Sequence, residues 1–473
     1  MRKPSACDGC PARGWGEYYV PDERRPGAQI ELWGQNPGEY EEKGARCVSK
    51  TSVGAWQTEP CSPAPFIGPT GYTLAKSYFP VAGVERGDLS LHNVIRCRQH
   101  GTNDLPELDR IVTKQIISHC QRAHYVPTDA KLVVTEGAYA LYAATGEDGG
   151  WNAASEKPPY KKVGARTVDG WRGWVLPYSP EQRRSFTDLY TPRRDERCVL
   201  AMFHTAFLFR APWYIPAAKR DWARVPQILR GLWPQPLSPI DPVHPSEWPL
   251  EAAFDTEFHT EYGRQILTRY SMFTDGVGGP HLWVVESDGV RAWPVIREKP
   301  TVIMWNIEAD YEHFFELTGT RDIDIEDGMF AHAVNWSDLD HDLDFAGSMD
   351  ARINRWKHLM RTAPRVYAGG DAVGTWDAWQ SAKRSFRADP PSERVYRDQV
   401  LPLFPIIARA RKHGVRVDGR RVLGALHALE EQCTSAERRA QAWTGYPMNL
   451  GSSQQVAKWL YDIEGLGKRA KKH

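Results

Sequence analysis

Acidic residues recur in three short segments of the C-terminal half of the chain, in an order that suits a two-metal site. The segments are Asp255-Thr256-Glu257, Asn306–Asp310 and Tyr367–Asp371, and they supply four carboxylates and a tyrosine. Two divalent cations about 4 Å apart can activate water and stabilise the leaving oxygen of a phosphodiester, provided that several anionic oxygens converge on them. The pattern therefore predicts metal-dependent cleavage of a nucleic acid.

The sequence before each segment predicts strands that would position the carboxylates. Residues 250–254 are largely apolar and predict a buried strand that runs into Asp255. The two-residue period of a strand puts Asp255 and Glu257 on the same face, where they can share a metal. Residues 302–305 predict a second strand, so that Asp310 falls on the following turn or helix start.

The remaining residues of the set are expected on helices. Asn306 stands where its side chain can cap exposed backbone amides. Tyr367 and Asp371 are four residues apart, and so they are neighbours on one face if this segment is helical. We expect the tyrosine to orient the attacking water. Two Mg²⁺ or Mn²⁺ ions would be bound by Asp255, Glu257, Asp310 and Asp371.

A single acidic residue usually lies on a solvated surface, and Asp and Glu total 59 of the 473 residues, so only the ordered set is informative. This set resembles the three motifs of the DEDD exonucleases, in the tyrosine-bearing form found in A-family DNA polymerases. The resemblance implies a 3′→5′ proofreading exonuclease over residues 250–395. Its fold would be a ribonuclease H-like mixed sheet flanked by helices, with residues 265–273 and 281–285 as antiparallel strands beside Asp255.

The residues that follow extend the resemblance. Residues 401–418 resemble the segment by which A-family polymerases pass from exonuclease into polymerase, and residues 449–456 resemble the start of their thumb. Palm and fingers have no counterpart before His473. We therefore expect residues 396–473 to be the helical beginning of a phage-type polymerase region, in an N-terminal fragment or a split subunit. Residues 420–442 have helical composition, and their apolar stripe predicts a partner such as a polymerase palm and fingers chain.

Cysteines mark the start of the N-terminal half. Cys7 and Cys10 have the two-residue gap that lets both thiolates reach one metal centre. Cys97 and Cys120 complete a four-thiolate set for either zinc or an iron–sulfur cluster, and the spacing alone does not distinguish them. The other cysteines are expected to be ordinary thiols: Cys47, Cys61, Cys198 and Cys433.

Four further motifs follow one another in this half, at residues 34–38, 65–71, 91–98 and 203–210. In this order they resemble the family-four uracil-DNA glycosylases, over nearly the whole of residues 1–231. The resemblance implies a three-layer α/β/α domain with a central parallel sheet, whose strands, such as residues 29–33 and 131–135, end in ligand-binding loops. It also implies a [4Fe-4S] cluster on Cys7, Cys10, Cys97 and Cys120.

Excision of a base requires that the base be flipped out of the duplex and gripped. Phe66 would stack on uracil, Asn93 would pair with its edge, and His204 would stabilise negative charge on the departing base. The turn at residues 34–38 would bring backbone amides close to the base, and Arg210 would hold a phosphate. Each residue alone also fits a structural role, so the prediction depends on the whole set and its order.

Two residues depart from the family pattern. Gln35, which belongs to the predicted uracil pocket, stands where the family usually has an acidic residue, and Thr205 stands where it usually has a proline. A glutamine cannot act as a general base. Asn36 occupies the place of a water-positioning residue in related families. Two alternatives stay open. The first is slow excision that uses Asn36 and His204, and the second is a retired, inactive site that binds uracil or single-stranded DNA or simply shapes a replication assembly.

Length and composition, with 41% hydrophobic and 25% charged residues, are those of a globular protein with several domains. No apolar run approaches membrane-spanning length and the N-terminus is not a signal peptide, so we expect a cytoplasmic protein, in an infected bacterial cell if the gene belongs to a phage. The net charge of +1 gives no global attraction to DNA, which leaves local clusters such as Arg193-Arg194 to contact phosphates. Prolines punctuate residues 232–249 and predict a stiff linker between two domains.

The expected whole is a DNA replication and proofreading protein, with an exonuclease and a domain that recognises or excises uracil. The alternative is a non-catalytic DNA-binding and assembly subunit that scaffolds a separate polymerase chain.

Overall fold

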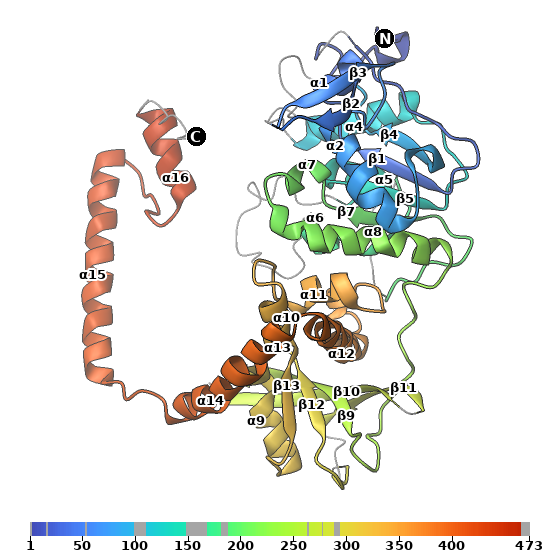
Figure 1. Cartoon of the computed structure of the whole chain (residues 1–473). Coiled ribbons are helices and arrows are strands. Elements are labelled where there is room, and N and C mark those ends of the chain that lie inside the picture. The colour runs from blue at the N-terminus through green and yellow to red at the C-terminus, as the bar shows by residue number, and fades with distance from the viewer. Residues whose placement is uncertain are drawn as a thin grey trace. The chain divides into compact units, whose positions relative to one another are not determined.

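Five short segments of the N-terminal half form a mainly parallel sheet in the computed structural model of this chain (Figure 1). The strand order is β4-β1-β5-β7-β6, with β6 antiparallel to its neighbour. The bounds are β1 (Ile30–Gly34), β4 (Leu89–Asn93), β5 (Leu132–Glu136), β6 (Val175–Pro177) and β7 (Cys198–Met202). Every residue of these strands is buried, and because neighbouring residues point to opposite faces, both faces of the sheet are covered. The strands predicted at residues 29–33 and 131–135 are β1 and β5.

Helices and a small hairpin complete this half. The longer helices are α4 (Arg110–His124), α5 (Ala138–Thr145) and α8 (Ile215–Leu229). The shorter elements are η1 (Ser5–Cys7), α1 (Glu39–Lys43), β2 (Ala45–Lys50), β3 (Trp56–Pro60), α2 (Pro69–Thr73), η2 (Leu74–Tyr78), α3 (Phe79–Ala82), η3 (Arg86–Asp88), α6 (Val168–Trp171), α7 (Thr205–Leu208) and η5 (Pro212–Tyr214). The structure describes residues 2–15, 18–52, 54–98, 110–147, 168–180, 188–262, 264–276, 278–287 and 294–464.

A second, mixed sheet follows, in the order β13-β12-β9-β10-β11-β8. Its strands are β8 (Ile240–Asp241), β9 (Glu251–Glu261), β10 (Arg264–Gly276), β11 (Gly279–Glu286), β12 (Thr301–Met304) and β13 (Asp324–Asp327). Strands β9, β10 and β11 are antiparallel, whereas β12 runs parallel to both β9 and β13. The antiparallel strands predicted at residues 265–273 and 281–285 are β10 and β11, so the predicted mixed sheet is confirmed.

A group of helices packs on this sheet and on one another. They are α9 (Ile307–Thr318), α10 (Gly328–Asn335), α11 (Leu343–Asp350), η7 (Lys357–Leu359), α12 (Pro364–Ala388) and α13 (Pro390–Val395), followed by η8 (Tyr396–Val400) and η9 (Leu401–Leu403). Small residues let α12 approach the strands closely. A Cβ on Gly369 would lie 3.0 Å from Leu282 Cδ2, and the Ser271 hydroxyl donates a 2.8 Å hydrogen bond to the Ala368 carbonyl. This contact fixes the helix that carries Tyr367 and Asp371.

The two sheets belong to one compact unit, Met1–Phe404, and their buried apolar residues form one continuous cluster. Residues 232–249 connect them and are themselves attached, because β8 pairs with β11 and the Trp233 indole donates a 2.9 Å hydrogen bond to the Ala351 carbonyl. The connection is therefore a packed segment.

The second unit is Pro405–His473, and its described part, up to residue 464, is mainly helical as expected. Most of α14 (Phe404–His413) belongs to it, together with α15 (Gly419–Thr444), α16 (Ser453–Lys458) and η10 (Trp459–Ile463). The Asp418 side chain caps α15, and α15 itself contains no buried residue. Helix α15 confirms the helix predicted at residues 420–442. None of the helices in the described ranges is long and apolar enough to cross a membrane.

Candidate functional site

The first sheet ends in a large cavity. Gln35 and Asn36 follow β1, Asn93 ends β4, and His204 follows β7, so that all four stand at the carboxyl ends of parallel strands, where α/β folds place their ligands. The cavity has a volume of about 1050 Å³. Its lining includes all of the residues predicted for the uracil pocket: Gln35, Asn36, Phe66, Asn93, His204 and Arg210.

Close backbone packing brings Phe66 and Asn93 together at the end of β1. A Cβ on Gly34 would lie 2.5 Å from Asn93 Oδ1 and 2.7 Å from Phe66 Cζ, so only glycine fits there. Phe66 has a positive φ of 54°, a conformation uncommon for a bulky residue and frequent at ligand sites. The Asn93 Nδ2 group is buried and has no hydrogen-bond acceptor among the described residues, which leaves a donor for a base edge.

The surroundings of His204 define its protonation state and its tautomer. Its Nδ1 atom accepts a 3.1 Å hydrogen bond from the Ala206 backbone N–H at the start of α7. Burial, with Arg210 acting in the same direction, lowers the pKa of His204 to about 4. The ring is therefore neutral near pH 7 and carries its proton on Nε2. That N–H is a donor that can stabilise negative charge on a departing base.

Glu41 also lines this cavity, and the sequence analysis overlooked it. Its carboxylate accepts hydrogen bonds from the backbone amides of Gly38, at 2.6 Å, and Phe66. Burial raises the pKa of Glu41 to about 7. A sequence signal existed, because Glu41 lies three residues after the turn glycine, which is the spacing of a capping box.

Glu136, at the end of β5, explains one departure from the glycosylase pattern. The hydroxyl and backbone N–H of Thr205 donate hydrogen bonds to its two oxygens, at 2.6 and 3.3 Å. A proline at position 205 would supply neither donor. Burial nevertheless raises the pKa of Glu136 to about 7.

The four cysteines predicted to share a metal centre line one small cavity. Cys7 and Cys10 come from the N-terminal segment, Cys97 follows β4, and Cys120 lies on α4. Burial, followed by the charges of the other cysteines, raises the pKa of the Cys7 thiol, and burial raises the pKa of the Cys97 thiol to about 12. Thiols that raise one another's pKa are stabilised as thiolates when a metal centre binds them. Of the other cysteines, Cys47 and Cys198 are buried, Cys61 is half-buried and Cys433 is exposed.

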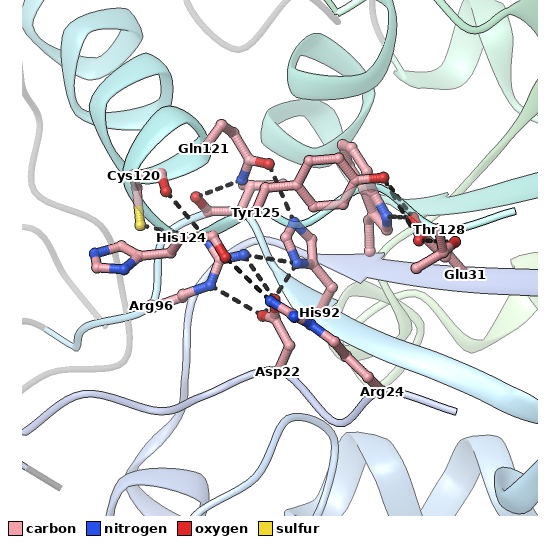
Figure 2. Close-up of polar contacts among 12 residues, drawn as sticks. Asp22, Arg24, Glu31, His92, Arg96, Cys120, Gln121, His124, Tyr125 and Thr128 are labelled. Atoms are coloured by element: carbon pink, nitrogen blue, oxygen red, sulfur yellow. Dashed lines mark hydrogen bonds and ion pairs between the residues drawn. The ribbon is translucent and has the colours of Figure 1, made fainter. Parts of the chain in front are cut away.

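A buried polar network supports this cavity (Figure 2). Arg96 donates two 2.9 Å hydrogen bonds to Asp22 and approaches the Cys120 sulfur at 3.6 Å. His92 lies 3.1 Å from the same aspartate through Nδ1 and 3.2 Å from Gln121 through Nε2. Although burial opposes the effect, His92 and Arg96 together hold the pKa of Asp22 well below its usual range. The network places a fixed positive charge beside Cys120.

In the second sheet, three of the predicted carboxylates converge. Oxygens of Asp255 and Glu257 on β9 and of Asp371 on α12 all lie within 4.8 Å of one another. Asp255 Oδ2 is buried without a hydrogen-bond donor among the described residues. Burial, followed by the charges of Asp371, Asp310 and Glu257, raises the pKa of Asp255 well above its usual range. Burial followed by Asp371 raises the pKa of Glu257 to about 7. Such crowding of negative charge is relieved when cations bind.

Asp310 lies beside this group, in the first turn of α9. Its Oδ1 atom accepts a 2.9 Å hydrogen bond from the backbone N–H of Thr256, the residue between Asp255 and Glu257, and a second one from the Thr256 hydroxyl. The predicted cap by Asn306 is wrong. Asn306 has a left-handed φ of 64° and its side chain makes no capping bond, because Asp327 accepts the Ile307 N–H at 2.8 Å in its place.

Two residues outside the predicted set bind Asp371. The Trp356 indole N–H donates a 2.6 Å hydrogen bond to Oδ1, and the Lys357 ammonium forms an ion pair with the same oxygen. Lys357 also lies 3.4 Å from the Tyr367 hydroxyl. Burial, followed by the charge of Asp371, raises the pKa of Tyr367, so this phenol stays protonated. No periodicity in the sequence pointed to residues 356 and 357.

The chain is similar to DNA polymerase I and to a type-4 uracil-DNA glycosylase. It is 35% identical over 100 residues to DNA polymerase I of Pseudomonas aeruginosa, which covers 21% of this chain and 11% of that protein. It is 27% identical over 146 residues to the type-4 uracil-DNA glycosylase of Sulfurisphaera tokodaii, which covers 30% of this chain and 56% of that one. The chain thus spans less than two thirds of the length of either relative. No family model matches it.

Two solved nuclease structures are also similar to part of the chain. Brucella melitensis NrnC with bound Mg²⁺ has a TM-score of 0.29 and 16% identity, covering 37% of this chain and 91% of that chain. Escherichia coli RNase D, an exoribonuclease involved in structured RNA processing, has a TM-score of 0.24 and 18% identity, covering 35% of this chain and 46% of that chain.

Proposed function

We propose that residues 250–395 form a metal-dependent 3′→5′ DNA exonuclease. The convergence of Asp255, Glu257 and Asp371 within 4.8 Å is the observation that carries the proposal, together with the unpaired buried oxygen of Asp255. These three carboxylates, with Asp310 beside them, would hold two Mg²⁺ or Mn²⁺ ions. The ions would lower the pKa of a bound water and stabilise the leaving oxygen.

The residues of the chain supply the rest of the reaction. The protonated Tyr367 hydroxyl can hold the attacking water, because it projects from the same face of α12 as Asp371. Thr256 fixes Asp310, and Trp356 and Lys357 fix Asp371, so that ligands from three separate elements keep their spacing. The positive charge of Lys357 offsets part of the negative charge that enters with a phosphodiester.

A uracil pocket is proposed for the cavity of the first sheet. Phe66 would stack on the base, the free Nδ2 donor of Asn93 would bind a base carbonyl, and the Nε2–H of His204 would face the charge that develops on the departing base. Gln35 and Asn36 would contact the sugar side of the flipped nucleotide, and Arg210 a phosphate. Excision and binding without excision both remain compatible with these donors, since neither Gln35 nor Asn36 is a strong base.

A [4Fe-4S] cluster is proposed for Cys7, Cys10, Cys97 and Cys120. Tetrahedral zinc, with Zn–S bonds of about 2.3 Å, would bring thiolate sulfurs within about 3.8 Å of one another. In the described part of the chain, no three of these sulfurs come within 4.8 Å of one another. A cluster with several atoms between its thiolates suits the wider spacing.

The surroundings of these sites suggest a replication role. We propose that residues 396–473 begin an A-family polymerase region and that the exposed side chains of α15 contact a polymerase palm and fingers chain. In the non-catalytic alternative, both domains scaffold that chain without cutting DNA. The two proposals differ in whether the isolated protein degrades a DNA strand.

The nuclease is tested with a 5′-labelled single strand of DNA, a matched RNA strand, and Mg²⁺ or a chelator. The wild-type protein should shorten the DNA from its 3′ end with Mg²⁺ only. Asp255→Asn should lose this activity, while Asp324→Asn should retain it, because Asp324 is an exposed acidic residue of β13 paired with Lys299. Shortening of the DNA that persists in Asp255→Asn, or in chelator, contradicts the proposal. Shortening of the RNA strand at the same rate as the DNA strand contradicts the preference for DNA.

The uracil pocket is tested in chelator, which silences the nuclease. A uracil-containing strand is incubated and then cleaved with alkali at any abasic site, and binding of the same strand is measured separately. Excision that is lost in His204→Gln and kept in His427→Gln, a change on α15, supports catalysis. Tight uracil-dependent binding without cleavage supports the retired site. The absence of excision together with equal affinity for uracil and thymine strands contradicts both.

A further inference from the structure

Residues 352–358, which we call the connecting segment, lie between α11 and α12 in the second domain and pack against the first domain. Asn354 is buried and its amide makes three hydrogen bonds to the first domain. It donates to the carbonyls of Val175 and Tyr190, both at 2.8 Å, and accepts the Val175 N–H at 3.2 Å. The segment is therefore fixed to strand β6 by one of its own side chains.

Two residues further along, Trp356 lies in a slot made of glycines. Its side chain is fully buried. A Cβ on Gly370 would lie 2.4 Å from Trp356 Cγ, one on Gly374 would lie 2.5 Å from Cη2, and one on Gly347 would lie 2.6 Å from Cη2. Any other residue at these positions of α11 and α12 would displace the indole. The slot fixes both the depth and the orientation of the ring.

This orientation aims the indole N–H at a carboxylate of the proposed metal site. The N–H donates to Oδ1 of Asp371 at 2.6 Å, and Lys357 pairs with the same oxygen. None of the described residues donates a hydrogen bond to the other oxygen of Asp371, Oδ2. Two donors on one oxygen hold the carboxylate in a single orientation and present the second oxygen to a cation.

The same indole also touches the first domain. The rings of Trp356 and Trp174 meet edge to face, with centroids 5.8 Å apart and an angle of 82° between their planes. Trp174 immediately precedes β6, whose first residue is held by Asn354. The position of Trp356 is thus determined from both domains.

We propose that Trp356 is a positioning residue, which fixes Asp371 for metal binding and makes the geometry of the metal site depend on the packing of the first domain. The inference rests on the proposed nuclease function. The alternative is that Trp356 contributes only packing. A positioning role requires the indole N–H as a donor to Asp371, whereas a packing role requires only the shape of the ring.

The test compares Mn²⁺ binding of the wild-type protein and Trp356→Phe, by electron paramagnetic resonance of free Mn²⁺. Loss of an outer donor to a metal ligand typically weakens metal affinity about 10–100-fold. We expect a weakening in this range for Trp356→Phe. The matched control is Trp379→Phe, which also removes a buried indole N–H bonded to a carboxylate, in this case Glu251 at 3.4 Å, and should bind Mn²⁺ as the wild type does.

The dependence on the first domain is tested by Trp174→Phe and Asn354→Ala. Both should weaken Mn²⁺ binding by a smaller factor of about 2–10, because they act through Trp356. Thermal unfolding in chelator separates folding from metal binding. If Trp356→Phe does not fold, 3-benzothienylalanine at position 356 keeps the ring shape and removes the N–H.

Unchanged Mn²⁺ affinity in Trp356→Phe, or an equal loss in Trp379→Phe, overturns the positioning role. Unchanged affinity in both first-domain variants overturns the dependence on that domain. Mn²⁺ binding by a wild-type protein that hydrolyses no DNA refutes the nuclease function alone, and the comparison of affinities still decides the role of Trp356.

Discussion

Replacing Asp255 by asparagine should stabilise the metal-free protein and at the same time remove its stabilisation by metal. Asp255 is half-buried, and its Oδ2 atom is buried without a hydrogen-bond donor among the described residues. Its pKa is raised well above the usual range by burial and then by Asp371, Asp310 and Glu257. At pH 8 the unfolded chain carries an ionised carboxylate here, so the native state must either keep a proton or hold the charge in an unfavourable place, and both cost stability. Asparagine has the same shape and no charge.

The magnitude follows from the desolvation of one unpaired buried group. Leaving a buried polar group unsatisfied costs about 1–3 kcal/mol. We expect Asp255→Asn to recover about this much in chelator, an increase of roughly 1–4 °C in the unfolding temperature of a compact unit the size of Met1–Phe404. Metal at a hundred times its dissociation constant stabilises the wild type by about 2.7 kcal/mol and should not stabilise the variant.

The assay is thermal unfolding at pH 8, followed by circular dichroism, in chelator and in a series of Mn²⁺ concentrations. The variant should have the higher unfolding temperature in chelator, and the wild type should have the higher unfolding temperature in Mn²⁺. Asp324→Asn should show neither effect. A variant that is less stable than the wild type in chelator would show that the carboxylate is paired in the native state, and this result would refute the reasoning.

Three further predictions concern other groups. Because the pKa of Glu136 is raised to about 7 from an ordinary 4.5, the folded state keeps a proton that the unfolded chain releases. Wild-type stability should therefore fall as the pH rises from 4.5 to 7. Glu136→Gln should show a shallower fall, because Glu41 and Glu257 still contribute to it, and should be more stable than the wild type by up to about 3 kcal/mol above pH 7, as measured by urea unfolding. Cys97→Ser, purified anaerobically, should lose iron and broad visible absorption, whereas Cys433→Ser should keep both. Lys357→Met should be less stable than the wild type by about 1–3 kcal/mol in chelator, since it removes the cation from Asp371, and Mn²⁺ should restore much of that loss in thermal unfolding.

The sequence predicted well those residues that follow a strand. Gln35, Asn93 and His204 each come directly after or at the end of a parallel strand, and the carboxyl ends of such strands meet at one edge. The same logic applies to Asp255 and Glu257, whose common face follows from the two-residue period of β9. Local periodicity placed Asp255 and Glu257, because a strand fixes the direction of each residue, whereas Gln35, Asn93 and His204 were predicted from the resemblance to the glycosylase motifs.

Other residues had no local signal. Trp356 precedes the short turn η7 and Lys357 begins it, and their contact with Asp371 exists only because α12 passes beside them. Glu136 is held as a buried acid by two donors of Thr205, at the start of α7, which is distant in the sequence. Asn306 was assigned a capping role from its position, but the capping acceptor came from β13. Contacts between distant segments decided each of these cases.

The glycine slot around Trp356 limits how this protein can be divided. A fragment that starts at residue 250 would keep every predicted carboxylate ligand, yet it would remove Trp174 from the edge of the indole and leave the Asn354 amide without Val175 and Tyr190. The cut would expose one wall of a closely fitted cavity next to Asp371. An exonuclease built from this chain for use alone would therefore need a redesigned surface at the connecting segment, and transplanting the domain would require more than the choice of a boundary in the proline-rich stretch.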